Sequence, residues 1–256
     1  MATELLCVAH AQHPYYGVRR LSLELGWSEN KTRRVRRLAG IRIVTPRKKH
    51  SRGKPVPAEI VAPSNALKHY AVFKNQARPQ DGMNYAAMVN SGGWVQDFTH
   101  LWFDRTWHYL AAIIDLKTRQ VVGWSYGLNH SSELTYKALL DALSKHSPPA
   151  ILHSDQGSEY LSYKHHLLCE RMEMTLSCSN KSSPWQNGFM ESFFGKFKTE
   201  LGSLSQFKGI PELYEAIALA MHYYNTKRIH TSLHMSPAAY AASLTTRDNL
   251  LQKKGA

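Results

Sequence analysis

The chain has 256 residues, of which 43% are hydrophobic, and a formal net charge of +13. This length and apolar content allow one sizeable core domain and a small appendage. No apolar run approaches the roughly 18 residues of a membrane span, and the first ten residues lack the pattern of a secretory signal. The three cysteines form no Cys-x-x-Cys pair and are too few for a disulfide framework, so we expect a cytoplasmic protein.

The positive charge is concentrated in the N-terminal third. Residues 1–80 carry 16 Lys and Arg against 4 acidic residues, whereas residues 81–256 carry 16 against 15. Lysine and arginine that neutralise phosphates release counterions, so this asymmetry indicates a polyanionic partner such as a nucleic acid. The alternative is a solvated surface that only provides solubility.

Residues 13–41 are predicted to form two short helices. Apolar residues recur at helical spacing from Val18 to Leu25, and Gly26-Trp27-Ser28 interrupts the pattern. We expect Asn30 to cap the second helix and Gly40 to end it, because glycine readily adopts the left-handed conformation that follows many helices.

The second of these helices is strongly basic. Its apolar stripe consists of Val35 and Leu38 alone, so most of its surface is charged. The basic residues on that surface are Lys31, Arg33, Arg34, Arg36 and Arg37. A helix pair of this kind is typical of helix-turn-helix modules, and residues 1–45 are therefore predicted to bind DNA. Any basic two-helix hairpin would show the same pattern.

Residues 46–92 are predicted to form a basic, proline-rich linker. The run Arg47, Lys48 and Lys49 is expected to lie along DNA. One short helix is expected, near Ala66 to Asn75.

Residues 93–205 are predicted to form an α/β domain. Three strands come first, at Gly93–Thr99, Trp107–Asp115 and Arg119–Tyr126, and are expected to pair as an antiparallel meander. Helices and strands then alternate: a helix from Ser131 or Ser132, a strand at 150–153, a helix at 158–170 and a strand at 172–178. This order is that of a ribonuclease-H-like fold.

The last helix of this domain is predicted to run to about Leu201. The segment Ser183-Pro184-Trp185-Gln186 has the N-cap, first-turn proline and glutamine of a capping box. The expected buried stripe consists of Met190, Phe193, Phe194, Phe197 and Leu201. Residues 206–256 are predicted to be a C-terminal helical extension.

Three carboxylates stand in different local contexts. Asp97 ends the apolar run Gly93–Gln96 of the first strand, Asp155 follows the strand at 150–153, and Glu191 lies on the last helix, with 35 residues between the last two. Two-metal phosphodiester chemistry requires hard oxygen ligands that converge from separate elements of one scaffold. The three residues therefore predict a metal-dependent site that cuts polynucleotides.

Other polar residues near these positions have simpler interpretations. Asp115 is expected to begin a hairpin turn, and His153 to be a hydrogen-bonded core histidine. Glu159 is a candidate secondary ligand. A single turn aspartate or helix glutamate is weak evidence of a site, so the interpretation depends on the combination of all three carboxylates.

Several segments of the domain share motifs with one known family. They are Trp94–Thr99, Tyr109–Leu110, Ile114–Leu116, Val122–Trp124, His153–Tyr160, Asn187–Phe193 and Lys196–Leu201, followed by a tail from Tyr224 to Tyr240. They closely resemble the integrase-core DDE transposases of bacterial insertion sequences, of the OrfB type. His13-Pro14, Tyr16-Gly17 and Arg19-Arg20 resemble the helix-turn-helix stretch that precedes that core. Gln156 departs from the family, which often has arginine there.

The resemblance implies specific roles for the site residues. Asp97, Asp155 and Glu191 match the catalytic triad and would bind two Mg²⁺ ions, for which Mn²⁺ can substitute. Lys198 matches the basic residue that follows the glutamate by seven positions and would contact DNA.

The resemblance also implies a transposase that cleaves and joins DNA at the element ends and the target. Such a protein would act as a homo-oligomer, fused to or assisted by an upstream-frame partner, and would associate with the bacterial nucleoid when bound to DNA. Two alternatives remain open: a catalytically silent DNA-binding regulator or decayed element product, and a ribonuclease that acts on RNA–DNA hybrids.

Overall fold

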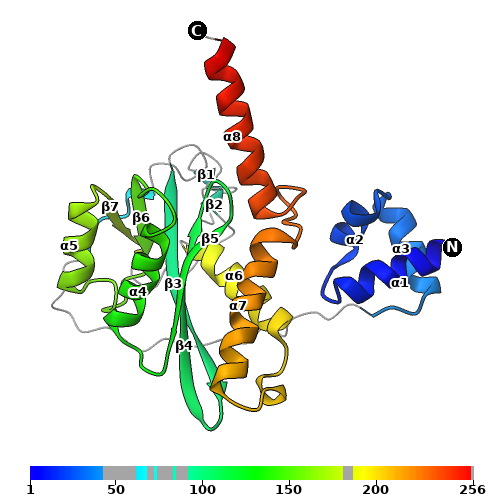
Figure 1. Ribbon diagram of the computed structural model, residues 1–256, viewed down its shortest axis with the longest axis horizontal. Coiled ribbons are helices and arrows are strands. Elements are labelled where there is room, and N and C mark those ends of the chain that lie inside the picture. Colours follow the sequence, from blue (N-terminus) through cyan, green and yellow to red (C-terminus); the bar gives the residue numbers. More distant parts are fainter. Residues whose placement is uncertain (43–61, 68–71, 74–82, 85–91, 181–186, 255–256) are drawn as a thin grey trace. The chain divides into compact units, whose positions relative to one another are not determined.

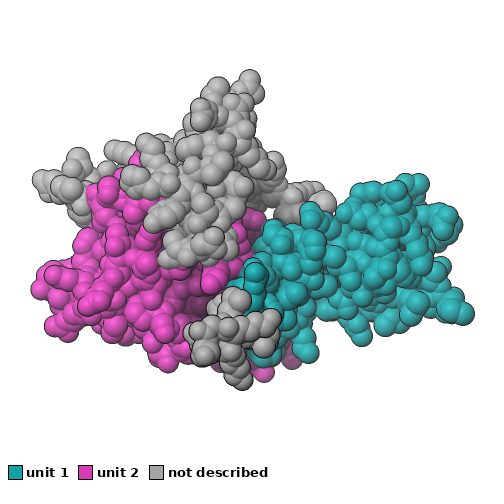
Figure 2. Space-filling view, turned by 90° about the horizontal axis from the view of Figure 1, so that it is seen from above, with its two compact units in different colours: residues 1–49, 196–202, 219–256 teal, residues 50–195, 203–218 magenta. Residues whose placement is uncertain are grey.

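The computed structural model describes residues 1–42, 62–67, 72–73, 83–84, 92–180 and 187–254 (Figure 1). The chain forms two compact units (Figure 2). Unit 1 contains residues 1–49, 196–202 and 219–256, and unit 2 contains residues 50–195 and 203–218. Each unit is therefore assembled from segments that are far apart in the sequence.

Unit 2 is built on a five-stranded sheet with the strand order β5-β4-β3-β6-β7. The strands are β3 (Gly93–Phe103), β4 (Thr106–Asp115), β5 (Val121–Gly127), β6 (Ile151–Ser154) and β7 (Thr175–Cys178). Strands β3, β4 and β5 are antiparallel, whereas β6 pairs in parallel with both β3 and β7. The predicted meander and the α/β class are confirmed, although β3 continues to Phe103 because Leu101 and Phe103 are also buried.

Two helices of unit 2 pack against this sheet. Helix α4 (Ser132–Leu143) begins after Ser131 as predicted and covers β4 and β5. A Cβ atom at Gly123 would lie 2.4 Å from the Ala138 carbonyl oxygen, so only glycine allows this close approach. Helix α5 (Tyr163–Arg171) begins five residues later than predicted, because residues 158–162 form a turn that buries Tyr160.

The core of unit 2 lies between the sheet and these helices. Ile113 of β4, Leu139 of α4 and Leu152 of β6 are almost fully buried in one apolar cluster. Each such side chain contributes roughly 1.5–3 kcal/mol relative to exposure to water. The sheet is therefore a rigid platform for the residues at its edge.

Unit 1 begins with three helices that pack on one another. They are α1 (Ala2–Gln12), α2 (Val18–Leu25) and α3 (Glu29–Leu38). The sequence predicted α2 and α3 but not α1, whose Leu6 and Ala9 are buried against them. Gly40 follows α3 with φ of +67°, as expected for a residue that ends a helix.

Two details of α3 differ from the prediction. Its N-cap is Ser28, whose hydroxyl accepts a hydrogen bond from the Lys31 amide at 3.3 Å, and not Asn30. Leu38 is 76% exposed, and the buried stripe consists of Thr32 and Val35. Thr32 can be buried because its hydroxyl donates to the Ser28 carbonyl at 3.0 Å.

Three further helices complete the chain. Helix α6 (Gly188–Leu201) ends where predicted, and all five residues of its expected apolar stripe are buried. The predicted capping box at 183–186 lies outside the described residues. Helices α7 (Ile210–Thr226) and α8 (Pro237–Lys254) follow, and α6 and α7 each contribute residues to both units. Over the described ranges, no helix combines the length and the hydropathy needed to cross a bilayer.

The region before the core contains a short strand pair. Strand β1 (Val72–Phe73) pairs in antiparallel fashion with β2 (Met83–Asn84). The helix predicted near Ala66 to Asn75 is therefore wrong at Val72–Phe73, where strand pairing overrides the local pattern. The basic run 47–49 lies outside the described residues.

Candidate active site at the edge of β3 and β6

Asp97 and Asp155 lie side by side at one edge of the parallel pair β3 and β6. The last paired residues of these strands are Val95 and His153, and each chain reaches an aspartate two residues later. Residues two apart face the same side of a sheet, and neighbouring strands are about 4.8 Å apart. Asp97 lies within β3, as it does in the predicted strand Gly93–Thr99. The backbone pairing itself therefore brings the two carboxylates together.

Tyr160 shows independently that these carboxylates share one neighbourhood. Its side chain is 2% exposed, and burial raises the pKa of its hydroxyl well above the usual value. The carboxylates of Asp97, Asp155 and Glu159 raise that pKa further. All three therefore lie within electrostatic reach of one buried hydroxyl.

The loop after β6 holds Asp155 in place. The Gly157 amide donates to Asp155 Oδ1 at 3.0 Å. A Cβ atom at Gly157 would lie 2.6 Å from Glu159 Oε2 and 3.0 Å from Asp155 Oδ1, so any larger residue would collide with two carboxylates. Burial raises the pKa of Asp155, the Gly157 amide opposes that shift, and Glu159 adds to it.

His130 is a site neighbour that the sequence did not indicate. Its Nε2 lies 3.0 Å from Glu159 Oε1, and its ring packs against Phe98 at 4.3 Å and stacks on Tyr109 at 5.4 Å. Glu159 is thus partnered by an imidazole, which makes it a weaker candidate for a metal ligand than the two aspartates. A lone histidine before a helix carries no sequence signal for such a contact.

Glu191 is exposed on the first turn of α6. The start of that helix is anchored to β3, because the Asn187 side-chain amide donates to the Gln96 carbonyl at 3.1 Å. Asn187 and Glu191 are four residues apart and so lie on one side of the turn. The Arg119 guanidinium lies 4.2 Å from the Phe189 ring centroid and holds the same turn.

The structure brings together two of the three predicted ligands. In the parts of the chain that the structure describes, no three His, Cys, Asp or Glu side chains form a group able to hold a metal ion. Asp97 and Asp155 are adjacent, and Glu191 lies on a separate element whose first turn is tied to the same strand.

A buried polar pair lies behind the site. Nε2 of His165, on α5, lies 3.2 Å from Oε1 of Gln96. Gln96 is the residue that precedes Asp97 in the sequence. Burial lowers the pKa of His165 to about 4, with a smaller contribution from His166. This histidine is therefore neutral at physiological pH.

Asp115 and His153 have the structural roles predicted for them. Asp115 ends β4 and accepts hydrogen bonds from the Thr118 amide at 2.6 Å and the Trp94 indole at 3.2 Å. His153 is fully buried between the hydroxyls of Ser177 and Ser179, at 2.9 and 3.0 Å.

The predicted DNA-binding residues on α3 are largely exposed. Lys31 lies over the Trp27 ring at 4.2 Å, and Arg33 pairs with Glu29 at 2.7 Å. Arg34 and Arg37 are exposed, and Arg36 is half-buried. Lys198 is exposed on α6, seven residues after Glu191, whereas Arg47, Lys48 and Lys49 lie outside the described residues.

Comparison with known families identifies one domain in this chain. Two models of the integrase core domain match it, one over residues 90–184 and the other over residues 172–237. Together they cover the five-stranded sheet, α6 and α7. The integrase core expected from the sequence motifs is thereby confirmed.

Curated relatives are insertion-sequence proteins. The chain is 39% identical over 154 residues to the insertion element IS600 uncharacterized 31 kDa protein of Shigella sonnei, covering 57% of this chain and 56% of that protein. It is 34% identical over 143 residues to the transposase for insertion sequence element IS904 of Lactococcus lactis, covering 55% and 56%. The chain spans about half the length of these relatives.

Solved structures share the fold. The HTLV-2 integrase catalytic core domain in complex with magnesium has a TM-score of 0.50 at 22% identity, covering 59% of this chain and 95% of that one. The simian T-cell lymphotropic virus intasome in complex with PP2A regulatory subunit B56 gamma has a TM-score of 0.54 at 16% identity, covering 93% and 73%. The ribonuclease-H-like fold predicted for the core is confirmed.

Proposed function

Because this chain contains an integrase core domain and is similar to insertion-sequence proteins, we propose that it cleaves and joins DNA strands during transposition. The observation that carries the proposal is the register of β3 and β6, in which Asp97 on the central strand and Asp155 just after β6 each follow the last residue pair by two positions. A polynucleotidyl transferase of this type needs carboxylates that converge from separate elements.

We assign Asp97, Asp155 and Glu191 as catalytic residues and ligands of two Mg²⁺ ions, which Mn²⁺ can replace. Carboxylate oxygens are the ligands these hard cations prefer. Two observations support a cation here. Burial and Glu159 disfavour the charged form of Asp155, and the buried Tyr160 hydroxyl has no hydrogen-bond partner among the described residues. When bound, such ions activate the attacking oxygen and stabilise charge on the leaving oxygen.

The residues of the chain have distinct tasks in this scheme. The sheet fixes Asp97 and Asp155, and the Asn187 anchor holds the turn that carries Glu191. We expect Lys198, two turns further along α6, to bind the phosphate next to the scissile one. Accurate placement of the attacking hydroxyl then supplies much of the rate.

The proposed partners are element ends and target DNA. Exposed Arg34, Arg37 and Lys31 on α3 would bind backbone phosphates, which gives affinity more than sequence choice. We further propose that the protein acts as a homo-oligomer on DNA and works with, or is fused to, an upstream-frame partner.

The direct test is a joining assay with the full chain, a labelled duplex of the element end and Mg²⁺ or Mn²⁺. Asp155→Asn keeps the size of the side chain but removes its charge, and we expect it to abolish both nicking and joining. The control is Glu170→Gln, an exposed acid on α5, which should behave like wild type. Full joining activity in Asp155→Asn would refute the assignment. Selective cleavage of an RNA–DNA hybrid would favour a ribonuclease instead.

A further inference from the structure

A buried ion pair links α6 to the segment that follows α7 in unit 1. Arg228 is 1% exposed, and its Nε donates to both carboxylate oxygens of Glu200 at 2.8 and 2.9 Å. Its guanidinium NH2 group donates to Glu200 Oε1 at 2.8 Å. A buried guanidinium requires such pairing, because an unpaired buried charge is very costly.

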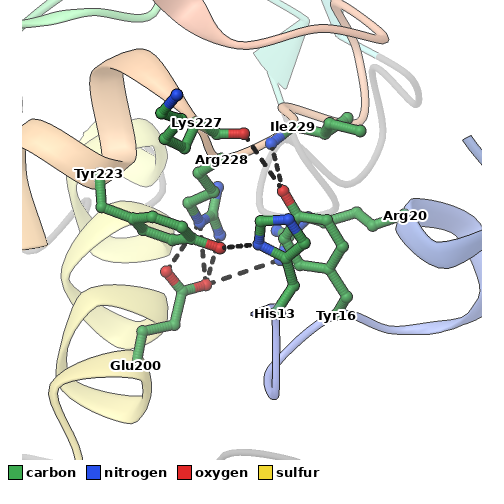
Figure 3. Close-up of polar contacts among 8 residues, drawn as sticks. All are labelled: His13, Tyr16, Arg20, Glu200, Tyr223, Lys227, Arg228 and Ile229. Atoms are coloured by element: carbon green, nitrogen blue, oxygen red, sulfur yellow. Dashed lines mark hydrogen bonds and ion pairs between the residues drawn. The ribbon is translucent and has the colours of Figure 1, made fainter. Parts of the chain in front are cut away.

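The N-terminal helices dock onto this ion pair (Figure 3). The Tyr16 hydroxyl accepts from the Ile229 amide at 2.7 Å, and His13 Nδ1 lies 2.7 Å from the Tyr223 hydroxyl. The His13 and Tyr16 rings stack at 4.4 Å. The motif His13, Tyr16 and Arg20, which resembles a helix-turn-helix stretch, therefore forms contacts within the chain.

The surface where α2 packs on α6 and on the segment after α7 has more cationic than anionic side chains. Arg20 of α2 lies 3.6 Å from Glu200, its side chain is 11% exposed, and its Nε has no hydrogen-bond partner among the described residues. Lys196 is exposed and precedes Glu200 by four residues, on the same side of α6. Lys196, Arg20 and Arg228 thus share the single carboxylate of Glu200, while Glu24 faces His13 at 4.0 Å.

The surroundings of Lys196 disfavour its charge. Lys196 is exposed as a residue, but its ammonium is desolvated by neighbouring atoms. That desolvation and the guanidinium groups of Arg228 and Arg20 lower its pKa to about 8, and Glu200 partly offsets them. An anion beside Lys196 would reverse this effect and relieve the repulsion among the three cations.

We propose that Lys196, with Arg20 behind it, binds a backbone phosphate of DNA on a surface formed by α2, α6 and the segment after α7. The inference rests on the proposed function, which makes DNA the anion available to this protein. It adds a contact that depends on docking of the N-terminal helices, because Arg20 belongs to α2 and Lys196 to α6.

The test measures binding of a duplex oligonucleotide by the full chain over a series of salt concentrations. Lys196→Gln should flatten the plot of log K against log salt by about 0.9, the effect of one lost phosphate contact. Lys196→Arg should restore the slope, and Lys164→Gln, an exposed lysine on α5, should leave it unchanged. Since Lys196 is exposed, the melting temperature of each variant should match wild type. A wild-type slope in Lys196→Gln would overturn the proposal.

The pH dependence gives a second readout. As pH rises through about 8, Lys196 loses its proton, so the affinity of the wild type for DNA should fall between about pH 7 and 9. Lys196→Arg should remove that fall, because arginine stays charged in this range. An equal fall in both proteins would contradict the proposal.

Failure of this inference can be distinguished from failure of the proposed function. Asp155→Asn should lose joining but keep the wild-type salt slope. If Asp155→Asn behaves in this way and Lys196→Gln also keeps the wild-type slope, the proposed function stands and the phosphate site does not.

Discussion

The two aspartates and Glu191 are held in place by different means. The backbone pairing of β3 with β6 brings the segments that carry Asp97 and Asp155 together, and the Gly157 amide then holds the Asp155 carboxylate. Among the described residues, the turn that carries Glu191 is held by the hydrogen bond from Asn187 to the Gln96 carbonyl and by the packing of Phe189 against Arg119. Sheet register fixes geometry more firmly than a helix end held by single contacts.

This difference suggests a division of labour within the site. In the proposed site, the aspartate pair would be a permanent part of the fold, whereas Glu191 would complete the site from an exposed helical turn. Substitutions of the aspartates and of Glu191 should therefore reduce joining activity equally. Their effects on the melting temperature should differ.

The largest expected effect is loss of joining in Asp97→Asn, Asp155→Asn and Glu191→Gln, by more than about 100-fold in each variant. In EDTA, Asp155→Asn should melt slightly above wild type, because burial and Glu159 disfavour the charge that it removes. Glu191→Gln should melt like wild type, since the residue is exposed. Calorimetry would measure both. A clear fall in the melting temperature of Asp155→Asn would contradict this account.

Lys198→Ala tests how far the glutamate side of the site extends along α6. We expect a loss of the order of 100-fold in joining, because a missing phosphate contact near the reacting end misplaces the nucleophile. Overall DNA affinity should change little. Lys164→Ala on α5 serves as the control, and equal activity in the two variants would show that Lys198 is ordinary surface charge.

Gly157→Ala tests the loop on the aspartate side. The new methyl group would displace the Glu159 carboxylate and crowd that of Asp155, so we expect reduced joining with a loss of at most about 1 kcal/mol in the free energy of unfolding. Gly195→Ala on α6 meets no atom within 4 Å and should instead stabilise the helix by about 0.5–1 kcal/mol. Urea denaturation would compare them, and a neutral result at Gly157 would show that the loop relaxes easily.

The smallest expected effect is the contribution of His165 to the free energy of unfolding at low pH. His165 has a pKa of about 4 when folded against an ordinary value of 6.5, so the unfolded chain binds more protons between these values. The stability contributed by the neutral imidazole is fully present above about pH 6.5 and is lost as pH falls, by up to about 1.4 kcal/mol per unit. His165→Gln should show a shallower loss between about pH 6.5 and 4.5. An unchanged slope would show that other groups dominate acid unfolding.

The sheet could be predicted from the sequence because its signals are local, and the carboxylates were proposed from local patterns of the same kind. Alternating apolar residues marked β3, β4 and β5, and the aspartates follow short apolar runs. The structural roles of Asp115 and His153 were also correct, since a turn and a buried strand leave clear local patterns.

The remaining features depend on contacts between distant segments. His130 pairs with Glu159, and Arg20 pairs with Glu200. The partners are too far apart in the sequence for a local pattern to predict these contacts. The N-cap of α3 was misplaced by two residues because Ser28 and Asn30 are both good caps and only packing decides between them. Leu38 was expected to be buried but faces solvent, because Thr32 and Val35 already fill the interface of this short helix.

The central claim is that Asp97 and Asp155 together form the preorganised half of a metal site. Titration of the full chain with Mn²⁺, followed by electron paramagnetic resonance, tests it without DNA or turnover. We predict that Asp97→Asn and Asp155→Asn each abolish the tightest bound ion, whereas Glu191→Gln retains it and loses only weaker binding. Unchanged tight binding of Mn²⁺ in Asp155→Asn would contradict the account.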